Sequence, residues 1–353
     1  MLVSVYSIVL TLGFDPWFCI INLIPSSILT FPSIMAPTSS NQNAPYGRRL
    51  MPVVLDDVAA NDPTRVFAAI PKSANISDGF RDVSYSEVAN STNKMARWFR
   101  ETFGTTSERE FETLTYIGVS DLRYSIAQYA AIKSGYKLLF PSPRNPVATI
   151  LSLIDQTQSS NLLYCQELAP LIHDIIQRRP DIRATAVESQ ETLLAAPHDP
   201  FPYTKSFREA LDDPIVILHS SGSTGMPKPV VMTNGTFAVH DNDRNFPHVE
   251  WRTNYDLTIW DFHGEIQRTY SPFPLFHLGG FLYQIMLPIY TNSIPVYGPP
   301  LAPPTAALIA EILERQDIHV SCIAIFYVLI MRKLHCYGLK NICTDPFVFV
   351  RVP

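Results

Sequence analysis

One stretch of this sequence is the most informative about fold and function: Leu218-His219-Ser220-Ser221-Gly222-Ser223-Thr224-Gly225-Met226-Pro227-Lys228-Pro229. The apolar run Ile215–Leu218 leads into it and predicts a buried strand. Glycines let the chain turn tightly and approach a ligand closely, and backbone N–H groups in such a turn form an anion-binding concavity. Lys228 adds a point charge suited to phosphate. The stretch therefore predicts a loop that holds a polyphosphate at the end of a strand.

The alternative interpretation of this stretch is an ordinary Ser/Gly surface turn. It is not a Walker A loop, because the G-x-x-x-x-G-K-[ST] spacing is absent. The order Ser-Gly-Ser-Thr-Gly-x-Pro-Lys resembles the phosphate loop of the adenylate-forming superfamily: acyl-CoA synthetases, luciferases and the adenylation domains of peptide synthetases. Most members have Gly after the lysine. Pro229 at that position is similar to the fungal synthetase-like enzymes and carboxylate reductases.

A second motif, Phe276-His277-Leu278-Gly279-Gly280, follows further along the chain. Alone this motif favours an ordinary loop histidine. Downstream of the phosphate loop, it resembles the fourth core motif of the same superfamily. The resemblance implies that Phe276 and His277 line the acyl-binding pocket. It also implies that Gly279 and Gly280 bind substrate by letting the next helix begin close to the ligand.

The chain around these motifs alternates predicted strands and helices, which favours parallel sheets covered by helices. Ser84 and Glu87 form the sequence signature of a capping box at the start of a helix, and Gly135 is a typical residue just after a helix end. The run 130–145, which includes the strand at 137–141 and the start of the turn 142–146 that closes it, resembles the second core motif, and we expect only a structural role for it. We expect residues 189–212 to be irregular and residues 241–268 to be loop.

The resemblance predicts an α/β fold, a partial acyl-CoA synthetase-like amino-terminal domain. We divide the chain into an apolar leader (1–34), a polar leader (35–48), a partial AMP-binding adenylation domain (49–324) and an off-pattern tail (325–353). Residues 1–34 are interpreted either as translated upstream sequence, with Met35 as the start, or as a membrane anchor. The tail is either intron read-through or a divergent last strand and helix.

Composition excludes several classes of function. The 353 residues are 46% hydrophobic and 17% charged, which is enough apolar sequence for a sizeable core. The net charge is −5 and no basic stripe is present, so no nucleic-acid partner is expected. The five cysteines are odd in number and no pair has C-x-x-C spacing, so neither a disulfide framework nor a zinc site is predicted, and no metal-ligating residue is assigned.

The resemblance implies that ATP and a carboxylic acid react, with Mg²⁺, to give an acyl-adenylate and pyrophosphate. In that interpretation Lys228, Thr224 and His277 are catalytic. The phosphates are held by Ser220, Ser221, Gly222, Ser223, Thr224, Gly225 and Lys228. A carrier-protein domain with phosphopantetheine, or CoA, would accept the acyl group in an intact homologue. We expect a cytoplasmic protein or, alternatively, one that is membrane-associated through residues 1–34.

Later motifs of the superfamily are not found in this sequence: the adenine-binding Gly-Tyr-Gly-x-Thr-Glu, the ribose-binding Asp of Thr-Gly-Asp and the closing catalytic lysine. Whether the chain is itself an enzyme is therefore open. It is either a fragment of an ATP-dependent carboxylate-activating enzyme or a catalytically inactive remnant, with or without membrane attachment, that binds nucleotide weakly or not at all. We expect no carboxylate-dependent exchange of pyrophosphate into ATP by the chain as given.

Overall fold

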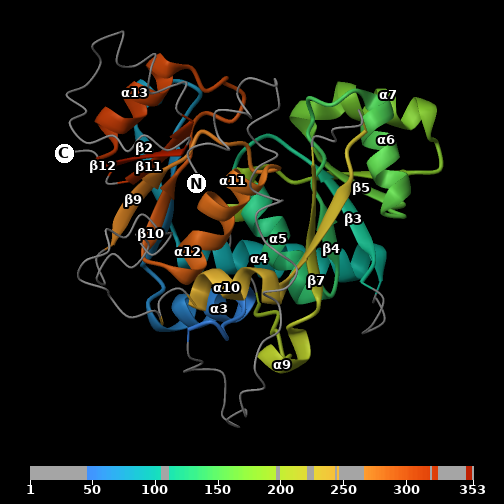
Figure 1. The fold of residues 1–353 in the computed structure, drawn as a ribbon, viewed down its shortest axis with the longest axis horizontal. Coiled ribbons are helices and arrows are strands. Elements are labelled where there is room, and N and C mark those ends of the chain that lie inside the picture. Colours follow the sequence, from blue (N-terminus) through green and yellow to red (C-terminus); the bar gives the residue numbers. More distant parts are fainter. Residues whose placement is uncertain are drawn as a thin grey trace, which may run out of the picture.

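The computed structural model describes residues 46–104, 111–195, 199–220, 226–242, 245, 266–318, 320–324 and 347–351. The described residues form two six-stranded sheets with helices packed on their faces (Figure 1). The predicted α/β fold with mostly parallel, helix-covered sheets is confirmed. The leader 1–34, residues 221–225 of the predicted phosphate loop and residues 325–346 of the tail lie outside the described part.

The first sheet has the strand order β12-β11-β9-β10-β1-β2. Its inner pairs are parallel, and β2 and β12 close its edges as antiparallel strands. Its strands are β1 (Val66–Pro71), β2 (Phe80–Ser84), β9 (Gln267–Tyr270), β10 (Ser293–Val296), β11 (Val320–Ala324) and β12 (Phe347–Arg351).

The second sheet has the strand order β6-β5-β3-β4-β7-β8 and is parallel except for the β7–β8 pair. Because strand side chains alternate between faces, Leu138 and Leu139 of β4 enter hydrophobic clusters on opposite sides of the sheet. The strands are β3 (Thr113–Ile117), β4 (Lys137–Leu139), β5 (Asn161–Cys165), β6 (Arg183–Val187), β7 (Pro214–His219) and β8 (Pro229–Thr233).

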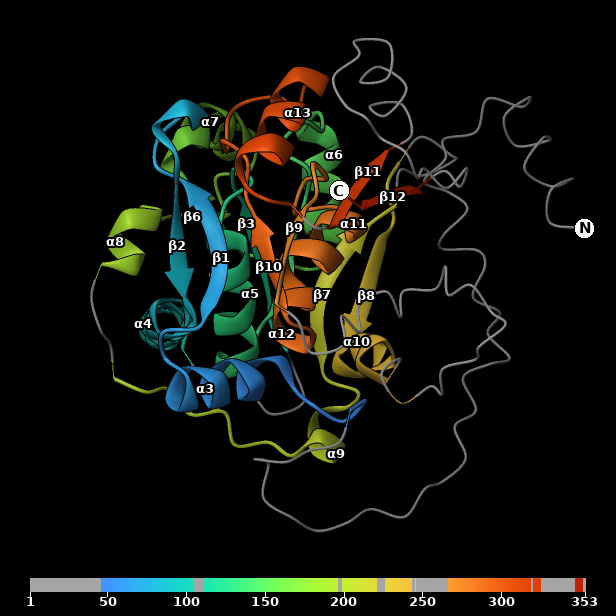
Figure 2. The same cartoon turned by 90° about the vertical axis from the view of Figure 1, so that its left-hand side faces the viewer.

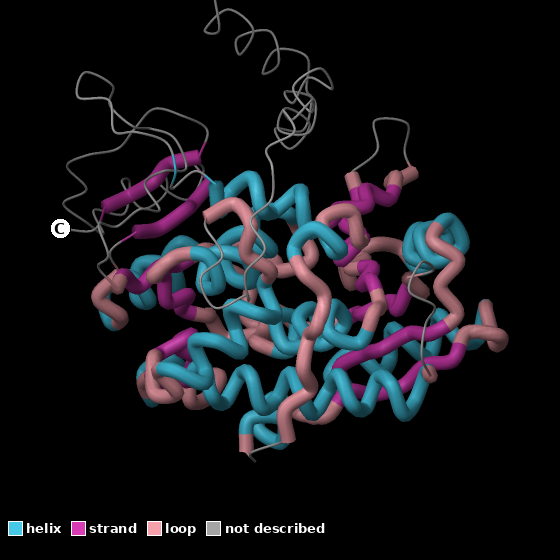
Figure 3. Tube along the Cα trace, turned by 90° about the horizontal axis from the view of Figure 1, so that it is seen from below, coloured by secondary structure: helices cyan, strands magenta, loops and turns pink. Residues whose placement is uncertain are grey.

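The helices form layers on and between the sheets (Figures 1 and 2). A central layer that includes α4 (Tyr85–Phe103) and α5 (Arg123–Ser134) shares one hydrophobic cluster with both sheets. On the outer faces, α13 (Ala306–Arg315) covers the first sheet, and α6 (Val147–Gln156) and α7 (Ala169–Arg178) cover the second. Figure 3 shows the strands on either side of the central helices.

The remaining helices are short or lie at the ends of the layers. They are α3 (Met51–Asn61), η3 (Ile76–Asp78), η4 (Gln166–Leu168), α8 (Gln190–Leu194), α9 (Phe207–Ala210), α10 (Asn234–Asn242), α11 (Leu278–Phe281), the π-helical η7 (Leu282–Met286) and α12 (Leu287–Tyr290). Within the described ranges, no helix combines the length and the apolar character that a membrane-spanning segment needs.

One predicted boundary in each of two central helices is confirmed by its capping contacts. The Ser84 side chain accepts from Glu87 N–H, and the Glu87 carboxylate accepts from Ser84 N–H at 2.7 Å, so the capping box at the start of α4 is complete. Gly135 ends α5 in the left-handed conformation, with φ of 85°. This conformation is costly for residues that carry a Cβ.

Two stretches differ from the sequence-based expectation. Residues 189–212, expected to be irregular, contain α8 and α9, whose starts are capped by the Ser189 and Ser206 side chains. Helices this short present too few turns for a clear hydrophobic period. The stretch 241–268, expected to be loop, ends inside β9, a polar strand held in the sheet by parallel neighbours on both sides.

Candidate functional site

The order of strands in the second sheet marks one edge as a ligand-binding edge. The crossover from β3 to β4 runs through α5 on the inner face, and the crossover from β4 to β5 runs through α6 on the outer face. The winding direction therefore reverses at β3, which lies between β4 and β5 in the sheet. In open α/β sheets, ligands bind outside the carboxyl ends of the strands at such a reversal. The candidate site is built on the carboxyl ends of β3, β4 and β7.

The base of the predicted phosphate loop lies at this edge. Strand β7 is buried along Ile215–Leu218 and pairs with β8 in antiparallel register, with His219 opposite Pro229. Ser220 N–H donates to the Lys228 carbonyl at 3.1 Å, and Lys228 N–H donates to Ser220 Oγ at 3.4 Å. These bonds close the base of the loop and leave the Lys228 side chain exposed. The predicted site residues Ser221, Gly222, Ser223, Thr224 and Gly225 lie outside the described residues.

His219, the last residue of β7, contacts the turn that follows β4. Ser142 N–H donates to His219 Nε2 at 3.2 Å. The other ring nitrogen, Nδ1, is buried and has no hydrogen-bond partner among the described residues. Burial lowers the pKa of His219, while the nearby Ser220 backbone acts in the opposite direction. The ring is therefore neutral near pH 7, with one nitrogen accepting a hydrogen bond and the other carrying the proton.

The second predicted motif lies beside the first. His277 precedes α11, and its ring centroid is 6.5 Å from that of His219. Phe276 is 4% exposed and belongs to the central hydrophobic cluster. The structure therefore brings His277 of the second motif beside His219, the residue that precedes Ser220, so the described parts of the two predicted motifs lie on neighbouring segments.

The Gly-Gly pair of that motif is required by the chain's own backbone. A Cβ on Gly280 would lie 2.1 Å from the Pro274 carbonyl oxygen, and one on Gly279 would lie 3.1 Å from the Phe273 ring. The close approach is thus between α11 and the segment that precedes it. Binding of substrate by Gly279 and Gly280 stays a prediction.

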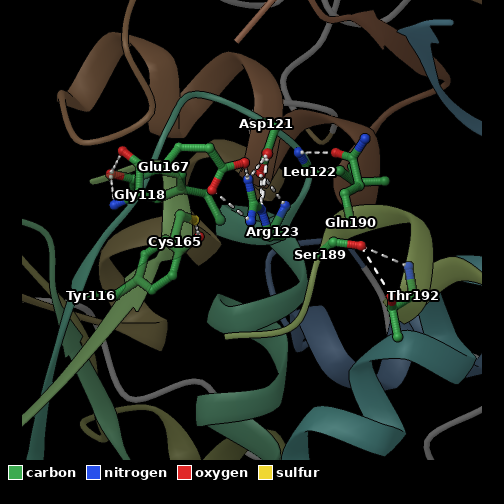
Figure 4. Close-up of polar contacts among 11 residues, drawn as sticks. Tyr116, Gly118, Asp121, Leu122, Arg123, Cys165, Glu167, Ser189, Gln190 and Thr192 are labelled. Carbon is green, nitrogen blue, oxygen red and sulfur yellow. Dashed lines mark hydrogen bonds and ion pairs between the residues drawn. The ribbon is translucent and has the colours of Figure 1, made fainter. Parts of the chain in front are cut away.

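A buried ion-pair cluster that sequence reasoning missed lies at the same edge (Figure 4). Arg123, at the start of α5, contacts Asp121 Oδ2 at 2.7 Å and Glu167 Oε1 at 2.6 Å. The side chains of Arg123 and Asp121 are 3% and 5% exposed. The cluster fastens the segment after β3 to the segment after β5. The Asp-x-Arg spacing directly after a strand was the available signal, but it resembles an ordinary helix start.

The charges in this cluster are mutually dependent. Burial raises the pKa of Asp121 even though its bonds with Arg123 oppose the shift. Burial would lower the pKa of Arg123, but the hydrogen bonds and charge of Asp121 and Glu167 outweigh it and raise that pKa. Nearby, Leu122 N–H donates to the Gln190 side chain at 2.9 Å, which ties α8 to the same segment. All these groups satisfy one another, so we assign the cluster a positioning role.

The described residues contain no group of three or more His, Cys, Asp or Glu side chains that could hold a metal ion.

A protein-family model and individual related sequences indicate the same family for this chain. Residues 55–335 match the protein family described as AMP-binding enzyme, a match that runs past Ala324. A carboxylic acid reductase of Neurospora crassa is 32% identical over 280 residues, which are 79% of this chain and 26% of that protein. An isocyanide synthase–NRPS hybrid of Aspergillus fumigatus is 34% identical over 264 residues, 74% of this chain and 17% of that protein. The chain thus spans about a quarter or less of these relatives' length.

Solved structures show the same fold at low sequence identity. The acetoacetyl-CoA synthetase from Streptomyces lividans matches 82% of this chain and 44% of its own length, with a TM-score of 0.65 and 16% identity. The anthranilate CoA ligase AuaEII, in complex with anthranoyl-AMP, matches 80% of this chain and 50% of its own length, with a TM-score of 0.61 and 16% identity.

Proposed function

Because the chain belongs to the AMP-binding enzyme family, we propose that it forms the phosphate-binding part of an adenylation domain that activates a carboxylic acid with ATP. The observation that carries the proposal is the closed base of the Ser220–Lys228 loop at the carboxyl edge of the second sheet. The exposed Lys228, and His277 with its ring centroid 6.5 Å from that of His219 at the loop base, support the proposal.

In this proposal the loop holds the phosphates of ATP while the carboxylate approaches. A carboxylate oxygen attacks the α-phosphorus, the bond from that phosphorus to its bridging oxygen breaks, and pyrophosphate leaves with the electron pair. Ser220 and Lys228 hold the β- and γ-phosphates together with residues 221–225, of which Thr224 has a catalytic role. Such loops act by positioning and by stabilising developing negative charge. Mg²⁺ enters with the nucleotide as the counter-ion of its phosphates.

The acyl side of the site is assigned to the second motif. His277, with the buried Phe276 beside it, forms the wall that faces the reacting carboxylate. Gly279 and Gly280 bring α11 close to that wall. The relatives carry the names of a carboxylic acid reductase and an NRPS hybrid. We accordingly propose that the acyl-adenylate passes to a carrier-domain thiol of a larger polypeptide, in the cytoplasm.

Pyrophosphate and ATP binding by the 353-residue chain tests the proposal by calorimetry. The Lys228→Ala variant should bind both at least about tenfold more weakly, because a charged hydrogen-bonding group is lost. Lys205→Ala is the matched control: it removes the same charge near the amino end of the same strand, where Lys205 pairs with Asp213. Equal binding by wild type and Lys228→Ala would refute the assignment of the loop.

A further inference from the structure

The turn Ser142–Asn145, which follows β4, contains a second buried donor without an acceptor. Asn145 Nδ2, like His219 Nδ1, has no hydrogen-bond partner among the described residues. Asn145 N–H donates to the Ser142 carbonyl at 3.1 Å, and Ser142 N–H donates to His219 Nε2. Both unpaired donors therefore belong to one hydrogen-bonded unit that joins the carboxyl ends of β4 and β7. A buried donor without a partner is costly, so each such group calls for an explanation.

The chemistry of this unit favours an anion. Ser142 N–H donates to Nε2 of a neutral imidazole, so the ring proton sits on Nδ1 and that nitrogen is a donor. The Asn145 amide nitrogen is also a donor. Two exposed cations, Arg144 in the turn and Lys228 at the loop base, form no ion pair among the described residues. Two donors and two cations without a described ion pair thus lie on segments at the carboxyl edge of the sheet, where ligands of such sheets bind.

We propose that the Ser142–Asn145 turn is a second wall of the phosphate site, in which His219 Nδ1–H and Asn145 Nδ2–H donate to the oxygens of a bound polyphosphate. The proposal rests on the function proposed above and adds a segment for which the sequence suggests only a structural role. Carboxylate oxygens accept from the same donors, so the acyl substrate is the competing source of the anion. Phosphate is favoured because His219 directly precedes Ser220 and the unit lies at the base of the loop.

Pyrophosphate binding by variants of the full chain tests the proposal. Asn145→Asp replaces the donor with a carboxylate of the same shape, and His219→Phe removes both ring nitrogens. Each should weaken pyrophosphate binding about tenfold or more, the loss expected for a hydrogen bond to a charged group. His219→Asn, which keeps an N–H close to the Nδ1 position, should weaken it less. Thr92→Val is the control, since Thr92 Oγ1 is another buried atom without a described partner, in α4.

A second measurement uses the wild-type chain, so its outcome does not depend on whether a variant folds. In the wild-type chain with ¹⁵N-labelled histidine, the His219 ring should show the neutral Nδ1–H form, and pyrophosphate should shift that signal. A shift with acetate and none with pyrophosphate would overturn the phosphate assignment. Unchanged pyrophosphate affinity in folded Asn145→Asp and His219→Phe, with weakened binding in Lys228→Ala, would overturn this inference and leave the proposed function standing. No pyrophosphate binding by the wild type would overturn both.

Discussion

At the scale of single residues, Gly280 belongs to a predicted substrate-binding motif, yet the packing of the protein's own backbone requires a glycine there. Its missing side chain lets α11 start against the backbone of residues 273 and 274, where the nearest backbone oxygen would lie 2.1 Å from a Cβ. The contacting atoms are backbone, which cannot move aside as a flexible side chain can. Rigid contact of this kind is resolved only by displacement of the segment that carries His277.

We therefore expect Gly280→Ala to destabilise the protein by about 1–3 kcal/mol or more, as overpacking does. The measurement is urea unfolding of both proteins followed by circular dichroism. Gly298→Ala is the matched control, because a Cβ there would meet its nearest neighbour at 3.5 Å, an ordinary contact. Equal stability of wild type and Gly280→Ala would show that the two segments separate at little cost.

The sequence predicts a site residue when its role depends on neighbours within one short segment. It does not predict a residue whose role depends on partners far away in the chain. The loop around Ser220 and the Phe276–His277 motif were predicted because each is a short, contiguous pattern. Arg123 with Glu167, and His219 with Ser142, contact each other across strands, and these partners are set by sheet topology. Without the strand order, a buried Asp-x-Arg pair looks like a helix start, and a Pro-rich turn looks purely structural.

At the scale of elements, α4 illustrates how far local rules reach. Its start was predicted from two residues, and the structure adds Arg81, whose guanidinium pairs with Glu87 at 2.7 Å. Burial acts to raise the pKa of Glu87, but hydrogen bonds from Ser84 and the contact with Arg81 outweigh it and lower that pKa. The polar strand β9, by contrast, could not be predicted from its own residues. It is a strand because it pairs with β10 and β11.

The lowered pKa of Glu87 has a definite consequence for stability. A carboxylate whose pKa is lower in the folded state stabilises the protein above its unfolded pKa, and that stabilisation is lost as pH falls through the folded value. Glu87→Gln keeps neutral hydrogen bonding and lacks the titrating charge. The free energy of unfolding, measured from about pH 3 to pH 7, should therefore differ most between wild type and Glu87→Gln at the upper end and converge at the lower end.

The control for this experiment is Glu101→Gln, an exposed position near the other end of α4. Its stability difference from wild type should be small and should not follow the Glu87→Gln curve. A pH-independent difference for Glu87→Gln would show that the capping bonds, and not the charge, carry the effect.

At the scale of the whole molecule, one hydrophobic cluster joins both sheets through the central helices. Phe67 of β1 and Leu138 of β4 belong to opposite sheets, yet both are fully buried in this cluster. Two sheets that share a core should unfold together, as single cooperative units do. The sequence predicted the alternation of strands and helices, but assigning strands to two sheets required pairing between distant segments.

Phe67→Ala and Leu138→Ala should each lower the free energy of unfolding, by about 3–5 and 2–5 kcal/mol. Both should shift one common transition, whether it is followed by tyrosine fluorescence or by far-ultraviolet circular dichroism. Two transitions, with each variant moving only one of them, would show that the sheets are independent units.

The pairing of β1 with β10 also sets an order of events during synthesis. Ala69 and Val296 are register partners, so nearly the whole described chain must leave the ribosome before β1 gains its inner neighbour. Every strand of the second sheet emerges before β10 does. Contacts this distant in sequence form slowly and leave strand edges open meanwhile. For that interval the nascent chain can complete its second sheet while the inner edge of β1, in the β1–β2 hairpin, stays unpaired. This edge is where we expect chaperones to bind.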